Sequence, residues 1–140
     1  MSKFNLDFTF TAYEIIDKNE NILSFRGAKK EIDYKSLLNS CDIGLSTVII
    51  KNNVLNDKTL RFAKLKTKED FVLWLKISKS GINLFGLNEK LSCWRKSPDS
   101  LSSSSIQKII DGYRVYREHL NFNAFKSIFY LLILSVNFLL

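Results

Sequence analysis

An apolar helical pattern between strand-like runs constrains the fold of this chain most strongly. The pattern has four large apolar residues at helical spacing and a glycine where a C-terminal cap would lie, namely Phe71, Trp74, Leu75, Ile77 and Gly81. Before it, LSTVIIK is rich in β-branched residues and has the length of a buried strand. After it, INLFGL and KLSCWR are typical of short strands separated by Asn88 and Glu89. Helices interspersed with strands predict an α/β fold with a mixed sheet and flanking helices.

The N-terminal part of the chain predicts a hairpin and a short helix. LDFTFTAYEIIDKNENILSF alternates polar and apolar residues, turns at residues 17–21 and then resumes. EIDYKSLLNSCDIG places Ile32, Leu37 and Leu38 at roughly helical spacing, so a short helix is expected there. Residues 51–66 are irregular and basic, which favours a loop with a short helical turn.

Two helices are predicted after the serine-rich loop KSPDSLSSSS. Ser104 and Gln107 have the capping-box form, and the amphipathic stripe that follows consists of Ile106, Ile109, Ile110, Tyr113 and Tyr116. From Ala124 to Leu140 the chain is a nearly continuous apolar tail, but its 17 residues fall short of the roughly 20 that a membrane crossing needs. Two interpretations stay open: this helix lies at a membrane interface beside basic residues, or it packs against protein.

The composition limits the possible partners. With 140 residues, 46% of them hydrophobic, the chain can bury one core, and a formal net charge of +7 favours nucleotides, anionic lipids or nucleic acid. P-loop, dinucleotide-binding, serine-hydrolase and zinc-protease motifs are absent, as is D-x-D. Cys41 and Cys93 are expected to be buried free thiols and His119 a solvated helix-end residue, so no metal site is predicted. The N-terminus lacks a signal-peptide core, which predicts a cytoplasmic location.

Glu69 and Asp70, at the start of the central helical pattern, allow two interpretations. Thr67 followed three residues later by Asp70 has the capping-box form, in which side-chain oxygens bind helix N–H groups. An acid in the first helical turn can also serve as a general base, because the helix dipole keeps it ionised and ready to accept a proton. The residues alone leave both interpretations open, and the two are compatible.

Four segments share an order and spacing with a known family: LNSCDIGLSTVIIKNNVL, KTKEDFVLWLKISKSG, INLFGLNEKLSCWRKSPDSLSS and YRVYRE. Together they resemble the C-terminal half of a bacterial glycosyltransferase family 2 enzyme, of the type that builds lipopolysaccharide or capsule. The resemblance implies an incomplete GT-A fold, whose other half would carry the nucleotide-sugar site and D-x-D. It assigns residues 1–103 to the acceptor-side half and residues 104–140 to C-terminal amphipathic and apolar helices.

The resemblance also implies roles for individual residues. Asp70 would be the general base that deprotonates the acceptor hydroxyl, with Glu69 positioning the acceptor. Arg95 would hold the nucleotide diphosphate, next to Trp94, which stands where tyrosine is usual. Four more polar residues would belong to the acceptor side and to a flexible flap, namely Ser46, Thr47, Ser100 and Ser102. Ser97 stands where many relatives have a histidine that can contact the metal.

The implied function is transfer of a sugar from a nucleotide-sugar donor to a lipid- or saccharide-linked acceptor, with no activity expected without the donor half. The complete family uses a divalent metal, Mg or Mn, but most residues that would bind it are absent here. Expected partners are the donor, a sugar or polyprenyl-linked acceptor and a separate N-terminal half. Peripheral association with the inner face of the cytoplasmic membrane is expected, and nucleic acid is not. The alternative is a small non-catalytic basic module that binds a membrane surface or nucleic acid.

Overall fold

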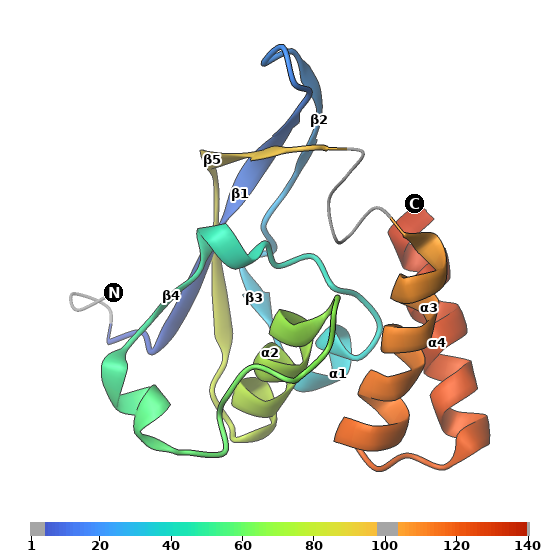
Figure 1. The fold of residues 1–140 in the computed structure, drawn as a ribbon. Helices are drawn as coiled ribbons and strands as arrows, with labels where there is room; N and C mark the ends of the chain where they lie inside the picture. The colour runs from blue at the N-terminus through green and yellow to red at the C-terminus, as the bar shows by residue number, and fades with distance from the viewer. Residues whose placement is uncertain (1–4, 98–103, 140) are drawn as a thin grey trace.

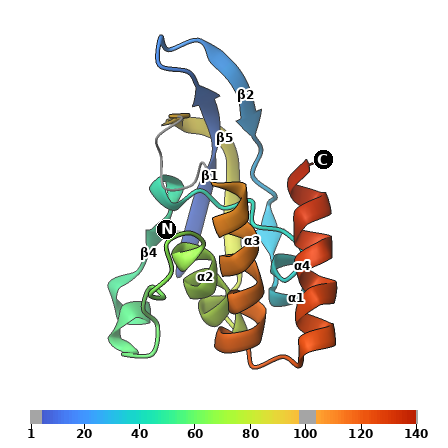
Figure 2. The same ribbon diagram turned by 45° about the vertical axis from the view of Figure 1, so that its right-hand side comes forward.

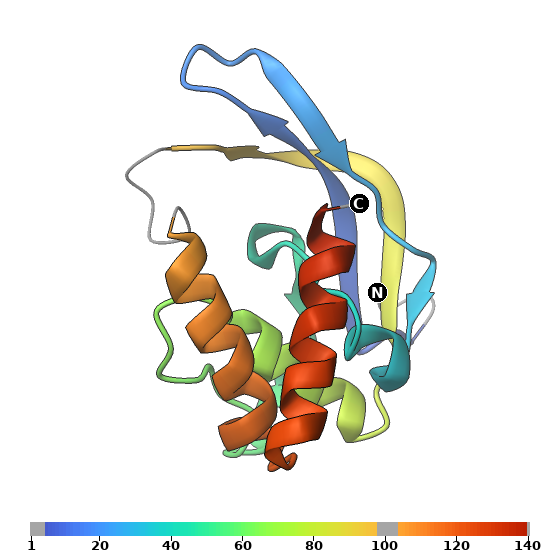
Figure 3. The same ribbon diagram turned by 90° about the vertical axis from the view of Figure 1, so that its right-hand side faces the viewer.

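The protein is an open mixed sheet, and the described α-helices α1 to α4 lie on one side of it (Figures 1 and 3). The computed structural model describes residues 5–97 and 104–139, and side chains as far as residue 137. Helices α1 (Tyr34–Leu37) and α2 (Glu69–Lys79) lie next to the sheet, and α3 (Ser105–Arg114) and α4 (Ala124–Leu139) form a layer farther out. The predicted α/β class, with a mixed sheet, flanking helices and a helical tail, is confirmed and is compatible with part of a GT-A-like fold.

The sheet is organised around the parallel pair β1 (Phe8–Ile16) and β5 (Leu84–Arg95). Strand β2 (Ile22–Arg26) pairs antiparallel with β1, which confirms the predicted hairpin. The carboxylate of Asp17 accepts backbone N–H groups of Asn19 and Asn21 at 2.8 and 2.9 Å, so it builds the turn. The strand order is β2-β1-β5-β3, with β3 spanning Glu31–Ile32 and β4 (Ile49–Ile50) pairing with β1 off this path.

The prediction of two strands in INLFGL and KLSCWR is wrong, because they form the single strand β5. The expected interruption appears instead as an irregular register, in which Leu87 lies opposite Thr11 but Lys90 lies opposite Ala12. Asn88 falls in the extra segment, where its side-chain oxygen accepts the N–H of Ala28 at 3.0 Å. Asn88 and Glu89 therefore lie at an irregularity within one strand and do not separate two strands.

The prediction of a buried strand in LSTVIIK is also wrong. Leu45–Thr47 form a short 3-10 helix, in which Gly44 O accepts both the N–H and the hydroxyl of Thr47, at 3.0 and 2.8 Å. Within this run, only Ile49 and Ile50, which form β4, pair with β1. The side chain of Ile49 is 61% exposed. Local hydrogen bonding by Thr47 thus overrides the β propensity of the run.

Helix α2 is the centre of the core, as its apolar pattern predicts. Trp74 packs edge-on against Phe8 of β1 with ring centroids 5.1 Å apart, and Phe71 packs edge-on against Tyr116 of the turn after α3 with ring centroids 6.5 Å apart. The helix ends at Lys79, with Ser80 as its C-cap, and Gly81 follows at φ +92°, a conformation that favours glycine. The α2 helix therefore joins the sheet to the outer helical layer.

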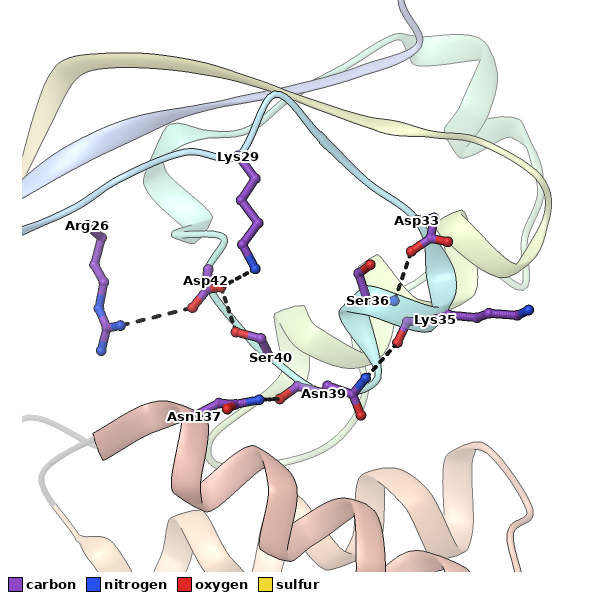
Figure 4. Close-up of polar contacts among 9 residues, drawn as sticks. All are labelled: Arg26, Lys29, Asp33, Lys35, Ser36, Asn39, Ser40, Asp42 and Asn137. Atoms are coloured by element: carbon purple, nitrogen blue, oxygen red, sulfur yellow. Dashed lines mark hydrogen bonds and ion pairs between the residues drawn. The ribbon is translucent and has the colours of Figure 1, made fainter. Parts of the chain in front are cut away.

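The short elements before and after the 3-10 helix Leu45–Thr47 are close to those predicted from the sequence. Helix α1 has four residues and is capped by Asp33, which accepts the N–H of Ser36 at 2.8 Å (Figure 4). Ile32, predicted to belong to this helix, lies in β3 because Glu31 and Ile32 pair with β5. The helical turn predicted within residues 51–66 is a 3-10 helix over Asn52–Asn56.

Helix α3 begins as predicted, but its first turns expose the side that was expected to be buried. The Ser104 hydroxyl accepts the N–H of Gln107 at 3.2 Å, and the helix continues as a π-helical turn over Val115–His119. The predicted apolar stripe is wrong in its first turns, because Ile106, Ile109 and Ile110 are exposed whereas Asp111 and Gly112 are buried. A Cβ on Gly112 would come within 2.9 Å of Leu131, so this small residue lets α4 approach closely.

The outer helices share one core with the rest of the chain. Helices α3 and α4 run antiparallel, side by side (Figures 2 and 3). The buried Tyr116 hydroxyl donates to Leu38 O at 2.8 Å, and Asn137 of α4 donates to Asn39 O at 2.8 Å. Described residues from both predicted segments, 1–103 and 104–140, therefore belong to a single hydrophobic cluster.

Candidate functional site

Glu69 and Asp70 occupy the first turn of α2, and the charge of Asp70 acts on Tyr13 of β1 and on Cys41 in the loop after α1. Asp70 is half-buried, and its Oδ1 accepts the N–H of Phe71 at 2.7 Å. Burial raises the pKa of Asp70, and the Glu69 carboxylate adds to the rise, while the Phe71 N–H and Lys68 oppose it. A carboxylate of raised pKa binds a proton more readily than an ordinary aspartate, as a general base requires.

The predicted capping box between Thr67 and Asp70 is wrong. The residue preceding α2 is Lys68, at φ +61°, and no side chain caps the helix there. Thr67 turns away and donates both its N–H and its hydroxyl to Oδ2 of the buried Asp111, at 2.9 and 3.0 Å. The segment before the acid pair is therefore anchored to α3.

Asp111 stays ionised although it is buried. Burial by itself would raise the pKa of its carboxyl group, but hydrogen bonds from Gln107 and Thr67 and the charge of Arg114 lower it below its usual range. Arg114 Nη1 lies 3.5 Å from Asp111 Oδ1, while its Nε binds Glu118 at 3.1 Å. A charged buried carboxylate thus fixes the backbone just ahead of Glu69 and Asp70.

Several titratable groups share the neighbourhood of Asp70. The pKa of Tyr13 on β1 is raised, chiefly by burial, and the charges of Arg26, Asp42 and Asp70 all act on it. Tyr13 lies against Gly44, where an added Cβ would come within 2.8 Å of the ring. A phenol, two carboxylates and a guanidinium are groups that can hydrogen-bond the hydroxyls of a sugar.

Asp42 is the centre of a polar network beside this neighbourhood (Figure 4). It accepts the Ser40 hydroxyl at 2.5 Å and lies 4.0 Å from Arg26 Nη1 and 3.8 Å from Lys29 Nζ. This network joins the end of β2 to the loop after α1. Asp42, Tyr13 and Asp111 were not identified from the sequence. Of these, only Asp42 had a signal in the sequence, because it lies two residues before Gly44 in LNSCDIGLST.

A second charged neighbourhood is basic. Lys68 lies along α3, where its Cε would be 3.6 Å from a Cβ on Gly112, and Lys108 lies one helical turn earlier. The pKa of Lys108 is lowered by burial and by the charges of Lys68 and Lys96. Three lysines from three segments thus create a positive potential around Lys108 of α3, and Lys68 directly precedes α2.

Arg95 lies away from the acid pair, at the end of β5 near the hairpin turn. Its Nη1 donates to Asp17 O and Lys18 O at 3.3 and 3.2 Å, and its Nη2 binds Glu20 at 3.2 Å. These contacts hold the hairpin turn against β5. Its implied role in holding a diphosphate stays a prediction, and a ligand would have to compete with these contacts.

The remaining predicted residues are dispersed. Thr47 is buried and its hydroxyl is used within its own turn, whereas Ser46 is exposed. Trp94 is partly exposed on β5, two residues after the irregular segment of that strand. Ser100 and Ser102 lie outside the described residues.

The cysteines and the histidine depart from expectation in part. Cys41 packs against the core and burial raises the pKa of its thiol to about 12, whereas Cys93 is exposed, so the prediction of two buried thiols is wrong for Cys93. His119 is half-buried with a buried Nε2, and burial lowers its pKa, so it is not the solvated residue expected.

Across residues 5–97 and 104–139, no three of His, Cys, Asp and Glu cluster in a way that could hold a metal. The described residues therefore do not fit the divalent metal that the resemblance implies.

Comparison with known proteins identifies the relatives of the chain. No protein-family model matches it. It is 34% identical over 134 residues to the UDP-Glc:alpha-D-GlcNAc-diphosphoundecaprenol beta-1,3-glucosyltransferase WfgD of Escherichia coli, covering 94% of this chain and 51% of WfgD. The chain resembles part of a polysaccharide glycosyltransferase.

Two further relatives are also glycosyltransferases by name. The chain is 29% identical to TuaG of Bacillus subtilis, named as a teichuronic acid biosynthesis glycosyltransferase, over 79% of the chain and 44% of TuaG. It is 30% identical to a second Escherichia coli enzyme with the same printed activity as WfgD, called WfaP, over 74% of the chain and 39% of WfaP. The chain thus spans about half the length, or less, of the curated relatives it matches.

Proposed function

We propose that this chain is the acceptor-side part of an inverting glycosyltransferase of family 2, with Asp70 as its general base. The observation that carries the proposal is the half-buried Asp70, whose pKa is raised at the start of a helix beside Glu69. The similarity to WfgD extends over 94% of the chain, which supports assigning the site to sugar transfer.

The proposed chemistry needs one proton acceptor and one positioned hydroxyl. Asp70 takes the proton from an acceptor hydroxyl while the oxygen forms a bond to the anomeric carbon of the donor sugar. The bond from that carbon to the nucleoside diphosphate breaks, and the electron pair leaves with the diphosphate. Glu69 orients the acceptor, and Tyr13 and Asp42 supply further hydrogen-bonding groups in the same neighbourhood.

The substrates follow by analogy with the relatives. WfgD and WfaP are named for UDP-Glc and a GlcNAc attached to diphosphoundecaprenol. For this chain we propose a nucleotide-sugar donor and a sugar acceptor attached to a lipid diphosphate, handled at the inner face of the cytoplasmic membrane. The positive potential of Lys68, Lys96 and Lys108 suits the diphosphate groups of either substrate, and Arg95 is a further candidate.

The donor site is proposed to lie in polypeptide beyond this chain. The relatives are about twice as long as the part matched here, and D-x-D is absent from the sequence. Polypeptide carrying the donor site is therefore an expected partner, and sugar transfer is expected only when it is supplied. It would also bring the groups that hold the divalent metal.

A reconstituted enzyme tests the proposal. The chain would be joined to the remaining part of WfgD, and transfer of radiolabelled glucose from UDP-Glc to a lipid-diphosphate GlcNAc acceptor would be measured. Asp70→Asn should lower kcat by about 10²- to 10⁴-fold, because proton transfer loses its base. The matched control is Asp57→Asn in an exposed turn, where the amide oxygen can still accept the N–H of Thr59.

The outcomes separate the proposal from the alternative. Unchanged transfer by the Asp70 variant would remove it as the base. Tight, salt-sensitive retention on DNA without any transfer by the joined enzyme would instead favour the basic module, whose support is the net charge of +7.

A further inference from the structure

The outward side of α4 is an apolar surface left uncovered by the rest of the chain. Phe125 is 88% exposed, and four more large apolar residues on this side are 48 to 61% exposed, namely Ile128, Phe129, Leu132 and Val136. Their spacing of three or four residues places them on one side of the helix. Phe129, Leu132 and Val136 also line a shallow hollow of about 390 Å³. We call these five residues the apolar face.

The apolar face is held in a fixed orientation by the opposite side of α4. Tyr130 stacks on Tyr116 with ring centroids 5.6 Å apart, and Leu134 is buried. Asn137 binds Asn39 O, and the N–H of Ser127 binds Asn123 O at 2.9 Å in the first turn. Because α4 already has a well-packed inner side, its outer side is a second, separate surface.

The neighbouring helix extends the exposed apolar area. Ile106 of α3 is 73% exposed, and Ile109 and Ile110 are 55 and 49% exposed. Figure 3 shows α3 and α4 side by side in front of the sheet and the other described helices. Exposed apolar areas of this kind mark interaction surfaces.

The charges of residues 120–140 have one sign, and Glu118 in the preceding turn is paired with Arg114 at 3.1 Å. Residues 120–140 contain no Asp or Glu, and their only charged residue is the exposed Lys126, whose Nζ lies 4.0 Å from the Phe122 ring centroid. Arg117, at the end of the preceding turn, donates to Phe122 O at 3.1 Å. A protein partner usually offers a polar rim with both signs, whereas anionic lipid head groups need only cations.

We propose that the apolar face docks on the surface of an anionic lipid bilayer, with α4 lying parallel to the membrane plane. An α-helix of 16 residues is about 24 Å long. Among the described helices, none is long and apolar enough to cross a bilayer. An apolar side with basic residues near it is typical of helices that lie in the interface.

Docking would bring the candidate site to its substrate. The hydrogen bond from Asn137 joins α4 to Asn39, and the next residues along the loop, Ser40 and Asp42, belong to the polar network beside Asp70 (Figure 4). An acceptor attached to a polyprenyl chain is held at the bilayer surface. This part of the inference rests on the proposed function, whereas docking itself does not.

Vesicle flotation of the full chain tests the docking. Binding would be measured to phosphatidylglycerol–phosphatidylcholine vesicles and to phosphatidylcholine vesicles alone. The double variant Phe129→Ser/Leu132→Ser should lower affinity for the anionic vesicles by about tenfold or more, because two large apolar side chains no longer enter the interface. Lys126→Glu should lower it by roughly five- to tenfold and weaken its dependence on salt.

A matched control lies on the sheet. Phe25 and Leu91 are each 64% exposed, on β2 and β5, so Phe25→Ser/Leu91→Ser removes comparable apolar area elsewhere. It should leave vesicle binding unchanged. Circular dichroism and thermal melting would verify that both double variants remain folded.

Distinct results would overturn the docking proposal. Equal vesicle binding by the α4 variant and the wild-type chain would do so. A concentration-dependent dimer in size-exclusion chromatography that the α4 variant loses would show a second copy on this face. Loss of vesicle binding when the donor part is added would show that protein covers it. Asp70→Asn should leave vesicle binding unaltered, so failure of the transferase proposal is seen separately.

Discussion

Helices α2 and α4 make opposite use of their apolar residues. In α2, a helix of 11 residues with charged residues at both ends, seven side chains are buried, namely Phe71, Val72, Leu73, Trp74, Leu75, Ile77 and Ser78. In α4 the sequence is more continuously apolar, yet only Ser127 and Leu134 are buried among its described side chains. The more hydrophobic helix is thus the less buried one. The hydrophobicity of a helix therefore indicates that it packs against a partner, but it does not indicate whether that partner belongs to the same chain.

The largest expected effect lies at the centre of α2. Trp74→Ala should lower the free energy of unfolding by about 3 to 5 kcal/mol, because it leaves a large cavity between Phe8 and the helix. Urea unfolding followed by circular dichroism measures the change. A loss below 1 kcal/mol would mean that α2 is not the centre of the core.

The next effect concerns the anchor between the two helical layers. Asp111→Ala should cost about 2 to 3 kcal/mol, because the N–H and hydroxyl of Thr67 lose their buried acceptor. Asp111→Asn is the matched variant, since its amide oxygen can still accept from Thr67, and it should cost less. Equal stability of the alanine variant and the wild-type chain would contradict the anchor.

A fall in pH should change the contributions of Asp111 and Asp70 to the free energy of unfolding in opposite directions. The pKa of Asp111 is lowered, so its stabilising effect is complete above the unfolded-state pKa of about 4 and is lost as pH falls through the native value. The pKa of Asp70 is raised, so protonating it as pH falls from neutral stabilises the fold. Asp70→Asn should therefore be at least as stable as wild type at pH 7. Thermal melts of both variants across pH 3 to 8 would show whether the two signs are correct.

The smallest expected effect is on the outside of α4. Leu132→Ala should change the free energy of unfolding by no more than about 0.5 kcal/mol, because this exposed side chain buries little in the free protein. Urea unfolding in the absence of lipid measures it. A cost comparable with that of Trp74→Ala would remove the contrast between the two helices.

The sequence predicts those features that depend on neighbouring residues. The hairpin around Asp17, the course of α2 to Gly81 and the Ser104 cap of α3 each rest on contacts within a few residues, and each is present. The fold class follows from the order of such elements.

Features set by distant contacts could not be predicted. Thr67 has the sequence of a capping residue, but its partner is Asp111, 44 positions away. The outward orientation of Ile106 follows from the close packing at Gly112, which an amphipathic pattern cannot reveal. The positions of Glu69 and Asp70 in the first turn of α2 were predictable, whereas the surroundings formed by Tyr13 and Asp42 depend on the fold.

The anchor between Thr67 and Asp111 has a practical consequence for dissecting this protein. A fragment that stops at residue 103 contains Glu69 and Asp70 but lacks Asp111, the carboxylate that fixes the backbone ahead of them. Tyr116, which ties α3 to Leu38, would be missing too. Any shortened or rearranged version of the chain that is meant to preserve the acid pair must therefore retain α3, although α3 contributes neither the proposed base nor a residue that orients the acceptor.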